Sequence, residues 1–429
     1  MSKGLYLFRS DLRLSDNPLL SRACKECDQL ALLVVLHPSQ WLDPRTHAVR
    51  QSFRRQHFIK ESVEDLRASI QTKGLQLIVR FGDELDVLKE IQRSYAMDKL
   101  YLEQLPGTEE VGIYDQLFNW CRQAGIQCNT LWQRTLHGIE QLPFELDRLP
   151  HIFTVFRQQV EKNWFVRPIE ELSKWPLMWD AQSDEWPNHL NVPVEMDARA
   201  VMSFKGGSLA AKERVQYYCS EPERLGRYKQ TRNGMVGADY SSKFSPWLSV
   251  GSISPVEIYH AIRDYEEQHG ANESSYWLIF ELLWRDFFQY TLWVHGDKVF
   301  QYDGFGKGRG PMKVSNEKAL SNWREGRTGN DFVDGCMREL VATGFMSNRG
   351  RQNVASYLVH DLQQDWRRGA EFFEYHLLDY DVASNWCNWA YIAGVGNDPR
   401  AGRRFNIDKQ ASDYDPNHTF RNHWKDGSK

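Results

Sequence analysis

Short apolar runs alternate with amphipathic stretches along the first third of the chain. The apolar runs predict five strands, at residues 5–8, 30–36, 75–79, 100–102 and 128–131. The stretches between them repeat apolar residues at helical spacing, roughly over 47–73, 84–94 and 109–123. Strands that alternate with helices are typical of a parallel sheet covered by helices. We therefore expect an α/β N-terminal domain with a parallel five-stranded sheet.

The pattern changes twice further along the chain. Residues 136–200 are irregular and rich in Pro and Trp, and they are longer than most connections. Such a segment usually wraps a neighbouring domain or forms a lid. After Gly206 and Gly207 the apolar spacing is helical nearly to the end. We predict an α/β domain at 1–135, a long linker at 136–200 and an all-α domain at 201–429.

Composition limits the classes of function. Hydrophobic residues make up 41% and charged residues 26%, which is typical of a globular chain. The formal net charge is -4, so a nucleic-acid site has to be a local basic patch. The sequence contains no apolar run long enough to span a bilayer, and a strand pattern near the start leaves no room for a signal peptide. The seven cysteines are scattered and odd in number, which favours reduced thiols in a cytoplasmic protein without a metal site.

A serine-rich segment at 240–246 supplies several hydroxyls, the cation of Lys243 and backbone donors, and Tyr228 and Arg232 precede it. Such a set suits a pyrophosphate group, which needs many donors and positive charge. A plain helix cap is the alternative, because Ser and Pro also favour helix starts.

Residues 277–288 place an acid and a base on an aromatic helical face. Glu281 and Arg285 share this face with aromatic side chains that include Trp284. Buried charges are costly unless they are paired or face a polar ligand. The face is therefore either a structural ion pair in a core or the wall of a cavity with two polar contacts.

Two further segments, 344–353 and 379–391, concentrate carboxylates, carboxamides and aromatics. Asn348, Arg351 and Gln352 share one helical face, while Arg349 points elsewhere and can reach a phosphate. No neighbouring acid–base group accompanies the two carboxylates at Asp379 and Asp381, which argues against a hydrolytic pair.

In this order, the segments resemble the photolyase/cryptochrome family over nearly the whole chain. The matching motifs are FRSDLR at 8–13, WREGRTG at 323–329, MREL at 337–340, TGFMSNR at 343–349 and DWR at 365–367. Three more resemble its DASH branch in particular: YKQTRNG at 228–234, NRGRQ at 348–352 and NDPR at 397–400.

The family binds FAD, folded into a U, in its helical domain. The resemblance implies that the flavin contacts come from Tyr228, Ser241, Ser242, Phe244, Ser245, Glu281, Arg285, Asn348, Arg351, Asp379, Asp381 and Asn385. The first five hold the phosphates and the ribityl chain, and Arg351 pairs with Asp379 beside the isoalloxazine. Asp381 and Asn385 face the polar edge of the flavin. Asn348 lies beside the central ring nitrogen, where an uncharged carboxamide suits a reduced, anionic flavin.

The family reaction is light-driven electron transfer from reduced flavin to a cyclobutane pyrimidine dimer that has left the base stack. The resemblance implies that Glu281 bonds the base edges, that Trp284 packs the dimer, and that phosphate-binding arginines hold the flanking backbone. The implied catalytic residues are Glu281, Trp284, Asn348, Trp389 and Trp366. The implied DNA-binding residues are Arg232, Trp284, Arg349, Gln352 and Tyr391.

Two positions imply a preference for single-stranded or looped DNA. Asn348 and Gln352 stand where enzymes for six-four photoproducts carry a histidine pair. Tyr391 stands where duplex-acting photolyases carry a second Trp. The implied protein is a monomeric DASH-type photolyase. The alternative is a blue-light photoreceptor with an unidentified signalling partner, which the short stretch after residue 416 disfavours.

The branch commonly carries a light-harvesting methenyltetrahydrofolate in the α/β domain. Glu110 resembles the family Glu that contacts its pterin, and Glu109 is an alternative register. Acidic residues in a first helical turn also simply favour a helix N-terminus.

Photoreduction in the family runs along three Trp from the flavin to the surface. Trp389 resembles the proximal member and Trp366 the middle one, but the third position is Lys313. A lysine cannot hold an electron hole, so either Trp323 or Trp386 takes over or the hole recombines. We expect photoreduction to be slow relative to the family.

Overall fold

The predicted strands form one parallel sheet in the order β3-β2-β1-β4-β5. Their bounds are β1 (Lys3–Phe8), β2 (Gln29–Leu36), β3 (Ile78–Phe81), β4 (Lys99–Glu103) and β5 (Gln127–Leu131). The prediction of a five-stranded parallel sheet is confirmed. A further two-residue strand from the linker, β6 (Leu177–Met178), pairs with the start of β2. Two residues are too few to produce a recognisable pattern, so the sequence did not predict β6.

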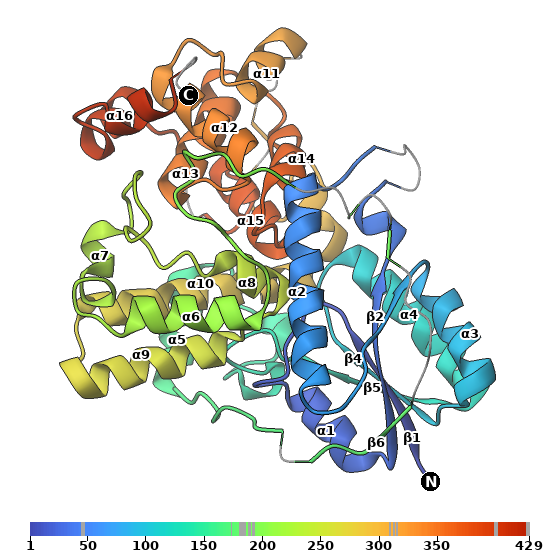
Figure 1. Ribbon diagram of the computed structural model, residues 1–429. Coiled ribbons are helices and arrows are strands. Elements are labelled where there is room, and N and C mark those ends of the chain that lie inside the picture. Colours follow the sequence, from blue (N-terminus) through green and yellow to red (C-terminus); the bar gives the residue numbers. More distant parts are fainter. Residues whose placement is uncertain are drawn as a thin grey trace.

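The computed structural model describes residues 1–43, 48–172, 174–179, 186–187, 190, 194–308, 310–311, 314, 316–398 and 402–425. The sheet and its helices lie beside a second, helical part, and the long α2 runs between the two (Figure 1). Within the described residues, no helix is long and apolar enough to cross a membrane.

The two faces of the sheet belong to different cores. Leu5 and Leu7 pack under α3 (Glu84–Tyr95) and α4 (Thr108–Ala124). Tyr6 and Phe8 point the opposite way, because side chains alternate along a strand. Their face carries α1 (Pro18–Glu26) and α2 (Phe53–Gln71), and its core continues into the helical domain. α2 begins later than predicted, after Ser52, whose side chain caps the helix by accepting from the Arg55 backbone N–H.

The linker contains a helix that the sequence pattern did not predict, α5 (Phe153–Lys162). Its buried residues Phe153, Phe156 and Val160 are spaced over about two helical turns, lie on one face and contact the helical domain. The surrounding prolines hid this pattern in the sequence. The exact domain boundaries stay a prediction.

The remaining helices form the C-terminal domain that the sequence predicted. They are α6 (Ser208–Cys219), α7 (Tyr228–Thr231), α8 (Ser245–Val250), α9 (Pro255–His269), α10 (Glu273–His295), α11 (Glu317–Arg324), α12 (Asp331–Thr343), α13 (Asn348–Ser356), α14 (Trp366–His376), α15 (Val382–Ala393), α16 (Ile407–Tyr414) and α17 (Thr419–His423). α10 packs against α15 and α7, which brings the 277–288 segment to the 379–391 segment.

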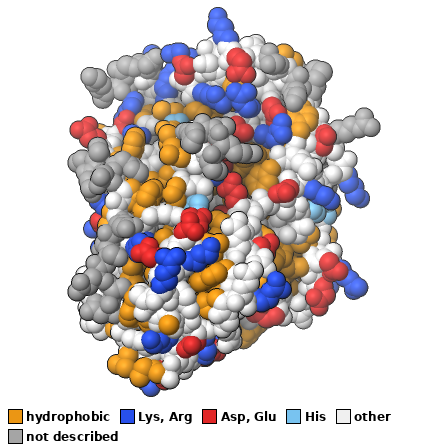
Figure 2. Space-filling view, turned by 90° about the vertical axis from the view of Figure 1, so that its right-hand side faces the viewer, with side chains coloured by type: hydrophobic (Ala, Val, Ile, Leu, Met, Phe, Trp, Pro, Cys, Tyr) orange, Lys and Arg blue, Asp and Glu red, His pale blue; other side chains and the backbone are white. Residues whose placement is uncertain are grey.

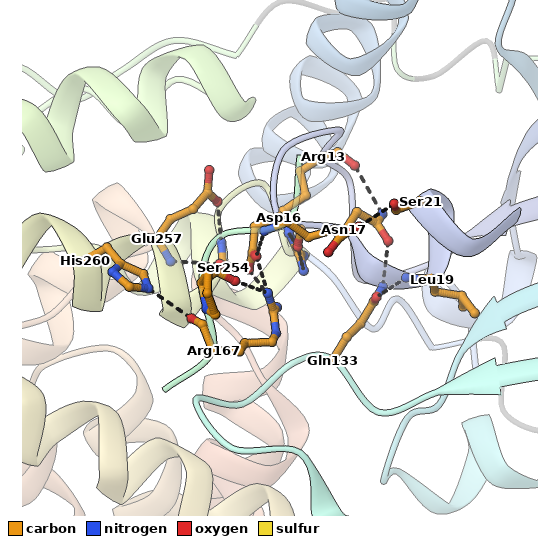
Figure 3. Close-up of polar contacts among 12 residues, drawn as sticks. Arg13, Asp16, Asn17, Leu19, Ser21, Gln133, Arg167, Ser254, Glu257 and His260 are labelled. Carbon is orange, nitrogen blue, oxygen red and sulfur yellow. Dashed lines mark hydrogen bonds and ion pairs between the residues drawn. The ribbon is translucent and has the colours of Figure 1, made fainter. Parts of the chain in front are cut away.

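The loop after β1 fastens the two domains together through Asp16 (Figure 3). The Asp16 carboxylate, which is fully buried, accepts from the guanidinium of Arg167 in the linker at 2.9 Å. The Asp16 carbonyl accepts from Arg13, whose other nitrogen donates to the Gly251 carbonyl before α9 at 3.1 Å. His260 of α9 in turn bonds the Arg167 carbonyl. The FRSDLR segment singled out in the sequence is therefore a junction between the domains.

Candidate functional site

A cavity of about 100 Å³ lies between α13, α14 and α15. It collects most of the polar residues of the two C-terminal segments: Asn348, Arg351, Gln352, Asp379, Asp381 and Asn385, with Trp389. α13 begins after Ser347, whose side chain accepts from the Gly350 N–H and turns Asn348, Arg351 and Gln352 toward the cavity. The prediction that these three residues share one face is confirmed.

Asp379 shows which kind of ligand the cavity can hold. One carboxylate oxygen accepts from the Ser245 hydroxyl at 2.6 Å and from Arg351 at 2.8 Å. The other oxygen is buried and has no hydrogen-bond partner among the described residues. A buried acceptor without a donor is costly. A flat heterocycle with an imide N–H would supply the missing donor, and the isoalloxazine ring of a flavin has one, so these residues fit a flavin.

Asp381 lines the same cavity, but its carboxylate is already occupied. It accepts from Arg134 at 3.1 Å, from Gln289 at 2.7 Å and from the Ser384 N–H, which caps α15. Burial alone would raise its pKa, but Arg134 and Arg285 together with the Ser384 bonds hold the pKa below its usual value. Asp381 therefore stays charged and ties the end of the α/β domain to α15.

The serine-rich loop is built around its lysine. Lys243 has a left-handed backbone, with φ 57°, and its buried ammonium donates to the Ala238 carbonyl at 2.9 Å. It also lies 3.3 Å from the centre of the Tyr240 ring. The interpretation of this cation as available to a pyrophosphate is wrong, because Lys243 stabilises the loop from inside. Ser245, in contrast, is exposed and bonds Asp379.

The other residues predicted to hold the phosphates and the ribityl chain are Tyr228 and, within this loop, Ser241, Ser242 and Phe244, and none of them lines the cavity. Tyr228 and Phe244 both contact the ring of Tyr218 edge-on. The backbone carbonyls of Ser241 and Ser242 accept from Arg214 of α6. Their contacts with a cofactor stay a prediction.

Glu281 forms an ion pair with Arg232, the residue directly after α7, rather than with Arg285. The alternative of a mutual Glu281–Arg285 pair in a core is therefore wrong. Arg285 instead donates to the backbone carbonyls of Arg134 and Leu248. Burial raises the pKa of Glu281, and Arg232 opposes that rise. The Arg232 guanidinium also lies over the Trp277 ring, at 5.2 Å from its centre. An acid with a raised pKa next to an aromatic surface can donate or accept a hydrogen bond.

Trp284 has aromatic neighbours on two sides. Phe153 of α5 stacks on it, with ring centres 3.7 Å apart and planes at 14°. Tyr391 of α15 meets it edge-on at 5.8 Å. The structure thus brings together the predicted pair Trp284 and Tyr391 and adds Phe153, a linker residue that gave no sequence signal.

The predicted phosphate-binding Arg349 and its neighbour Gln352 contact each other. Arg349 donates to the Gln352 side chain at 3.0 Å and to Asn233 at 2.9 Å, and it lies 4.6 Å from the centre of the Tyr414 ring. Asn233 directly follows Arg232, so the guanidiniums of Arg349 and Arg232 lie close enough to influence each other.

Trp389 forms part of the cavity wall, beside Phe373 and, at 6.2 Å, Trp323. Trp366 is fully buried and donates to the Tyr302 carbonyl. The ring of Trp366 meets Trp386 edge-on at 5.9 Å. Lys313, on which the prediction of slow photoreduction rests, lies outside the described residues.

A second, larger cleft of about 860 Å³ lies where the α/β domain meets α14 and α15. Glu109 and Glu110, at the start of α4, both line it. Glu109 is exposed and pairs with Arg50 at 2.8 Å, while burial raises the pKa of Glu110. Seen from the side of α3 and α4, the surface has a hollow near its centre that contains acidic side chains (Figure 2).

Several residues of this arrangement had no signal in the sequence. Arg134, Gln289 and Phe153 act through partners far away in the chain, and Arg50 and Glu374 meet across the second cleft at 3.0 Å. Only an alignment of related chains or the fold itself could have linked them. Within the described residues, no cluster of His, Cys, Asp or Glu could hold a metal ion.

Comparisons with known proteins agree with this geometry. The family described as "DNA photolyase" matches residues 4–174, and the family described as "FAD binding domain of DNA photolyase" matches residues 277–426.

Individual relatives match over nearly the full length. A cryptochrome DASH of Synechocystis is 41% identical over 98% of this chain and 86% of its own, and one of Xenopus laevis is 41% identical over 95% and 80%. The crystal structure of a Synechocystis cryptochrome superposes with a TM-score of 0.94 at 40% identity, covering 99% of this chain and 88% of that one.

Proposed function

Because this chain belongs to the photolyase/cryptochrome family and carries the FAD-binding domain of DNA photolyases, we propose that it repairs cyclobutane pyrimidine dimers in blue light. Its preferred substrate is single-stranded or looped DNA, and it acts as a monomer. The observation that carries the proposal is the unpartnered oxygen of Asp379 in a cavity walled by Trp389 and Asn385.

FAD, when bound and reduced, supplies the electron that light sends to the dimer. Asp379 would hold the polar edge of its ring through the free oxygen, while Arg351 and Ser245 fix the orientation of that carboxylate. Asn348 and Asn385 add carboxamides that carry no charge. The aromatic wall at Trp389 excludes water from the ring.

Glu281 recognises the dimer at its base edges. Its raised pKa lets the carboxyl group carry a proton at the moment a carbonyl of the substrate needs one. Arg232 neutralises Glu281 in the free protein and turns to a flanking phosphate when DNA binds, together with Arg349. Trp284, held in place by Phe153, packs against the dimer.

The preference for single strands follows from the energetics of flipping. Taking a dimer out of a duplex costs a few kcal/mol. Aromatic stacking returns roughly 1–3 kcal/mol per base. Tyr391, which is smaller than a Trp and is bonded to Arg403 through its hydroxyl, offers less stacking surface. A single strand does not incur the unpairing cost, so it remains the better substrate.

The test is dimer repair in matched single-stranded and duplex oligonucleotides, in light and in darkness, with chemically reduced protein. We expect light-dependent repair that is faster on the single strand and that Glu281→Ala abolishes. Glu273→Ala, on an exposed position of the same helix, is the control and should repair normally. Absence of any light-dependent repair would refute the proposal, and equal rates on the two substrates would refute the preference.

The second cleft is the proposed site of a methenyltetrahydrofolate antenna. Half-buried Glu110 contacts the pterin, while Glu109 is engaged with Arg50. Protein reconstituted with the folate should gain an absorption band beyond that of flavin. Glu110→Ala should lose this band and Glu109→Ala should keep it, and the reverse result would assign the contact to Glu109.

A further inference from the structure

The two cavities share a wall made of aromatic side chains. Tyr380 lines both of them. On α15, Trp389 faces the first cavity and Trp386 the second, and three positions separate them, which is one helical turn. The wall between the expected flavin and the large cleft is therefore a short run of oxidisable rings.

Hydrogen bonds connect the far end of this run to a carboxylate. The Trp386 indole N–H points at the Tyr380 hydroxyl at 3.3 Å and at Glu374 at 3.4 Å. The Tyr380 hydroxyl donates to the same Glu374 oxygen at 2.8 Å. Arg50 binds the other Glu374 oxygen at 3.0 Å and leaves the first one to Tyr380 and Trp386. Burial and Glu374 raise the pKa of Tyr380, so its phenol keeps its proton until it is oxidised.

We propose that Tyr380 is the terminal electron donor of photoreduction and that Glu374 accepts its proton. The inference rests on the proposed function, because the oxidant is photoexcited oxidised flavin in the first cavity. Trp389 loses one electron to that oxidant, and the hole passes to Trp386 directly or through Trp366. Tyr380 then gives one electron to the Trp386 cation radical and its hydroxyl proton to Glu374. The products are neutral Trp386, a neutral tyrosyl radical and a protonated Glu374.

Trp323 is the competing candidate for the terminal electron donor, and its surroundings suit that role less well. It is fully buried, donates to the Val354 carbonyl and contacts Phe372, which is harder to oxidise. No carboxylate among the described residues bonds its indole. A hole on Trp323 can therefore only return, whereas a hole on Tyr380 is held there by the loss of the proton. The route replaces the third Trp that Lys313 does not supply.

The experiment follows a blue flash on flavin-loaded protein by transient absorption and by electron paramagnetic resonance. The variants are Tyr380→Phe, which keeps the ring, Glu374→Gln, which keeps the shape, and Tyr375→Phe, a control on the same cleft. We expect a neutral tyrosyl radical in wild type and in the control, and its loss in Tyr380→Phe. Deuterated solvent should slow the decay of the Trp radical in wild type, and Glu374→Gln should slow it in ordinary water.

Ring-deuterated tyrosine identifies the radical, because it narrows a tyrosyl signal and leaves a Trp signal unchanged. A tyrosyl radical that persists in Tyr380→Phe, or a flavin-loaded wild type that forms only Trp radicals, would overturn this inference alone. Repair by the chemically reduced protein would then still stand. A chain that binds no FAD would overturn both the inference and the proposed function.

Discussion

Glu103 provides a sharp test of the electrostatics at the junction of the two domains. It ends β4, is fully buried, and neither of its carboxylate oxygens has a hydrogen-bond partner among the described residues. Burial raises the pKa of Glu103 to about 8, against the opposing charges of Arg134, Arg13 and Arg285. The folded protein therefore holds this proton at neutral pH, while the unfolded chain releases it near the ordinary value of 4.5.

The sign and size of the effect follow from linkage. Between pH 4.5 and about 8 the folded state binds a proton at Glu103 that the unfolded chain has released. The protonated carboxyl therefore makes its full contribution to stability below pH 4.5, and this contribution is lost as the pH rises to about 8. At ~1.36 kcal/mol per pKa unit, the loss is about 3 kcal/mol at pH 7 and about 5 kcal/mol above pH 8. Glu103→Gln puts a neutral amide of the same shape in this place. We expect it to be about 3 kcal/mol more stable than wild type at pH 7.

Urea denaturation at pH 5, 7 and 9, followed by circular dichroism, measures the difference. The advantage of Glu103→Gln should be within about 1 kcal/mol at pH 5 and should grow with pH. Glu267→Gln, on an exposed position of α9, is the control and should change stability by less than about 0.5 kcal/mol. A Glu103→Gln protein that is about 3–5 kcal/mol less stable at every pH would mean that Glu103 is ionised and paired with the arginines, which refutes the reasoning.

Three further predictions concern residues around the first cavity and the junction. Asp379→Ala should weaken FAD binding by about 2 kcal/mol, roughly thirtyfold, because a charge-assisted bond is lost, and the flavin-to-protein absorbance ratio after dialysis measures it. Arg134→Met should cost about 3–5 kcal/mol of stability by removing the ion-pair partner of the buried Asp381, and the double variant with Asp381→Asn should recover part of that in a double-mutant cycle. Burial lowers the pKa of His137 to about 4, so stability present above pH 6.5 should fall by up to about 3 kcal/mol toward pH 4, and His137→Gln should flatten this part of the denaturation profile.

The sequence predicted best the strands that are buried on both faces and the helices that have one clearly apolar face. β1 and β2 are buried on both faces, so continuous apolar runs marked them. The aromatic face of α10 was equally clear, because Glu281 and Arg285 recur on it at helical spacing. Local pattern also placed Asn348, Arg351 and Gln352 correctly, since one helix holds all three.

The pairings across the chain could not be predicted in the same way. Glu281 pairs with Arg232, which directly follows α7, and Asp381 pairs with Arg134 at the end of the α/β domain. Such pairs depend on how the domains dock, which no local pattern records. The prediction that the Lys243 cation is available to a pyrophosphate was wrong for a related reason. Its left-handed backbone turns the ammonium into the loop, and the sequence pattern does not show this conformation. The residue type limits which groups a side chain can bind, and the fold determines which of those groups lie within reach.

The position of the second cleft follows from the order of the strands. In an open parallel sheet, ligands bind beyond the carboxyl ends of the strands, where the strand order reverses. Here the order reverses between β1 and β4, and the cleft is lined by Phe8 at the end of β1, by Arg9 directly after it, and by Leu105 and Thr108 after β4. The helical domain docks at this same edge, so α14 and α15 close the cleft from the other side. A ligand in the cleft and a flavin in the first cavity are then separated only by the wall around Tyr380, which places both energy transfer and electron transfer within the reach of one layer of side chains.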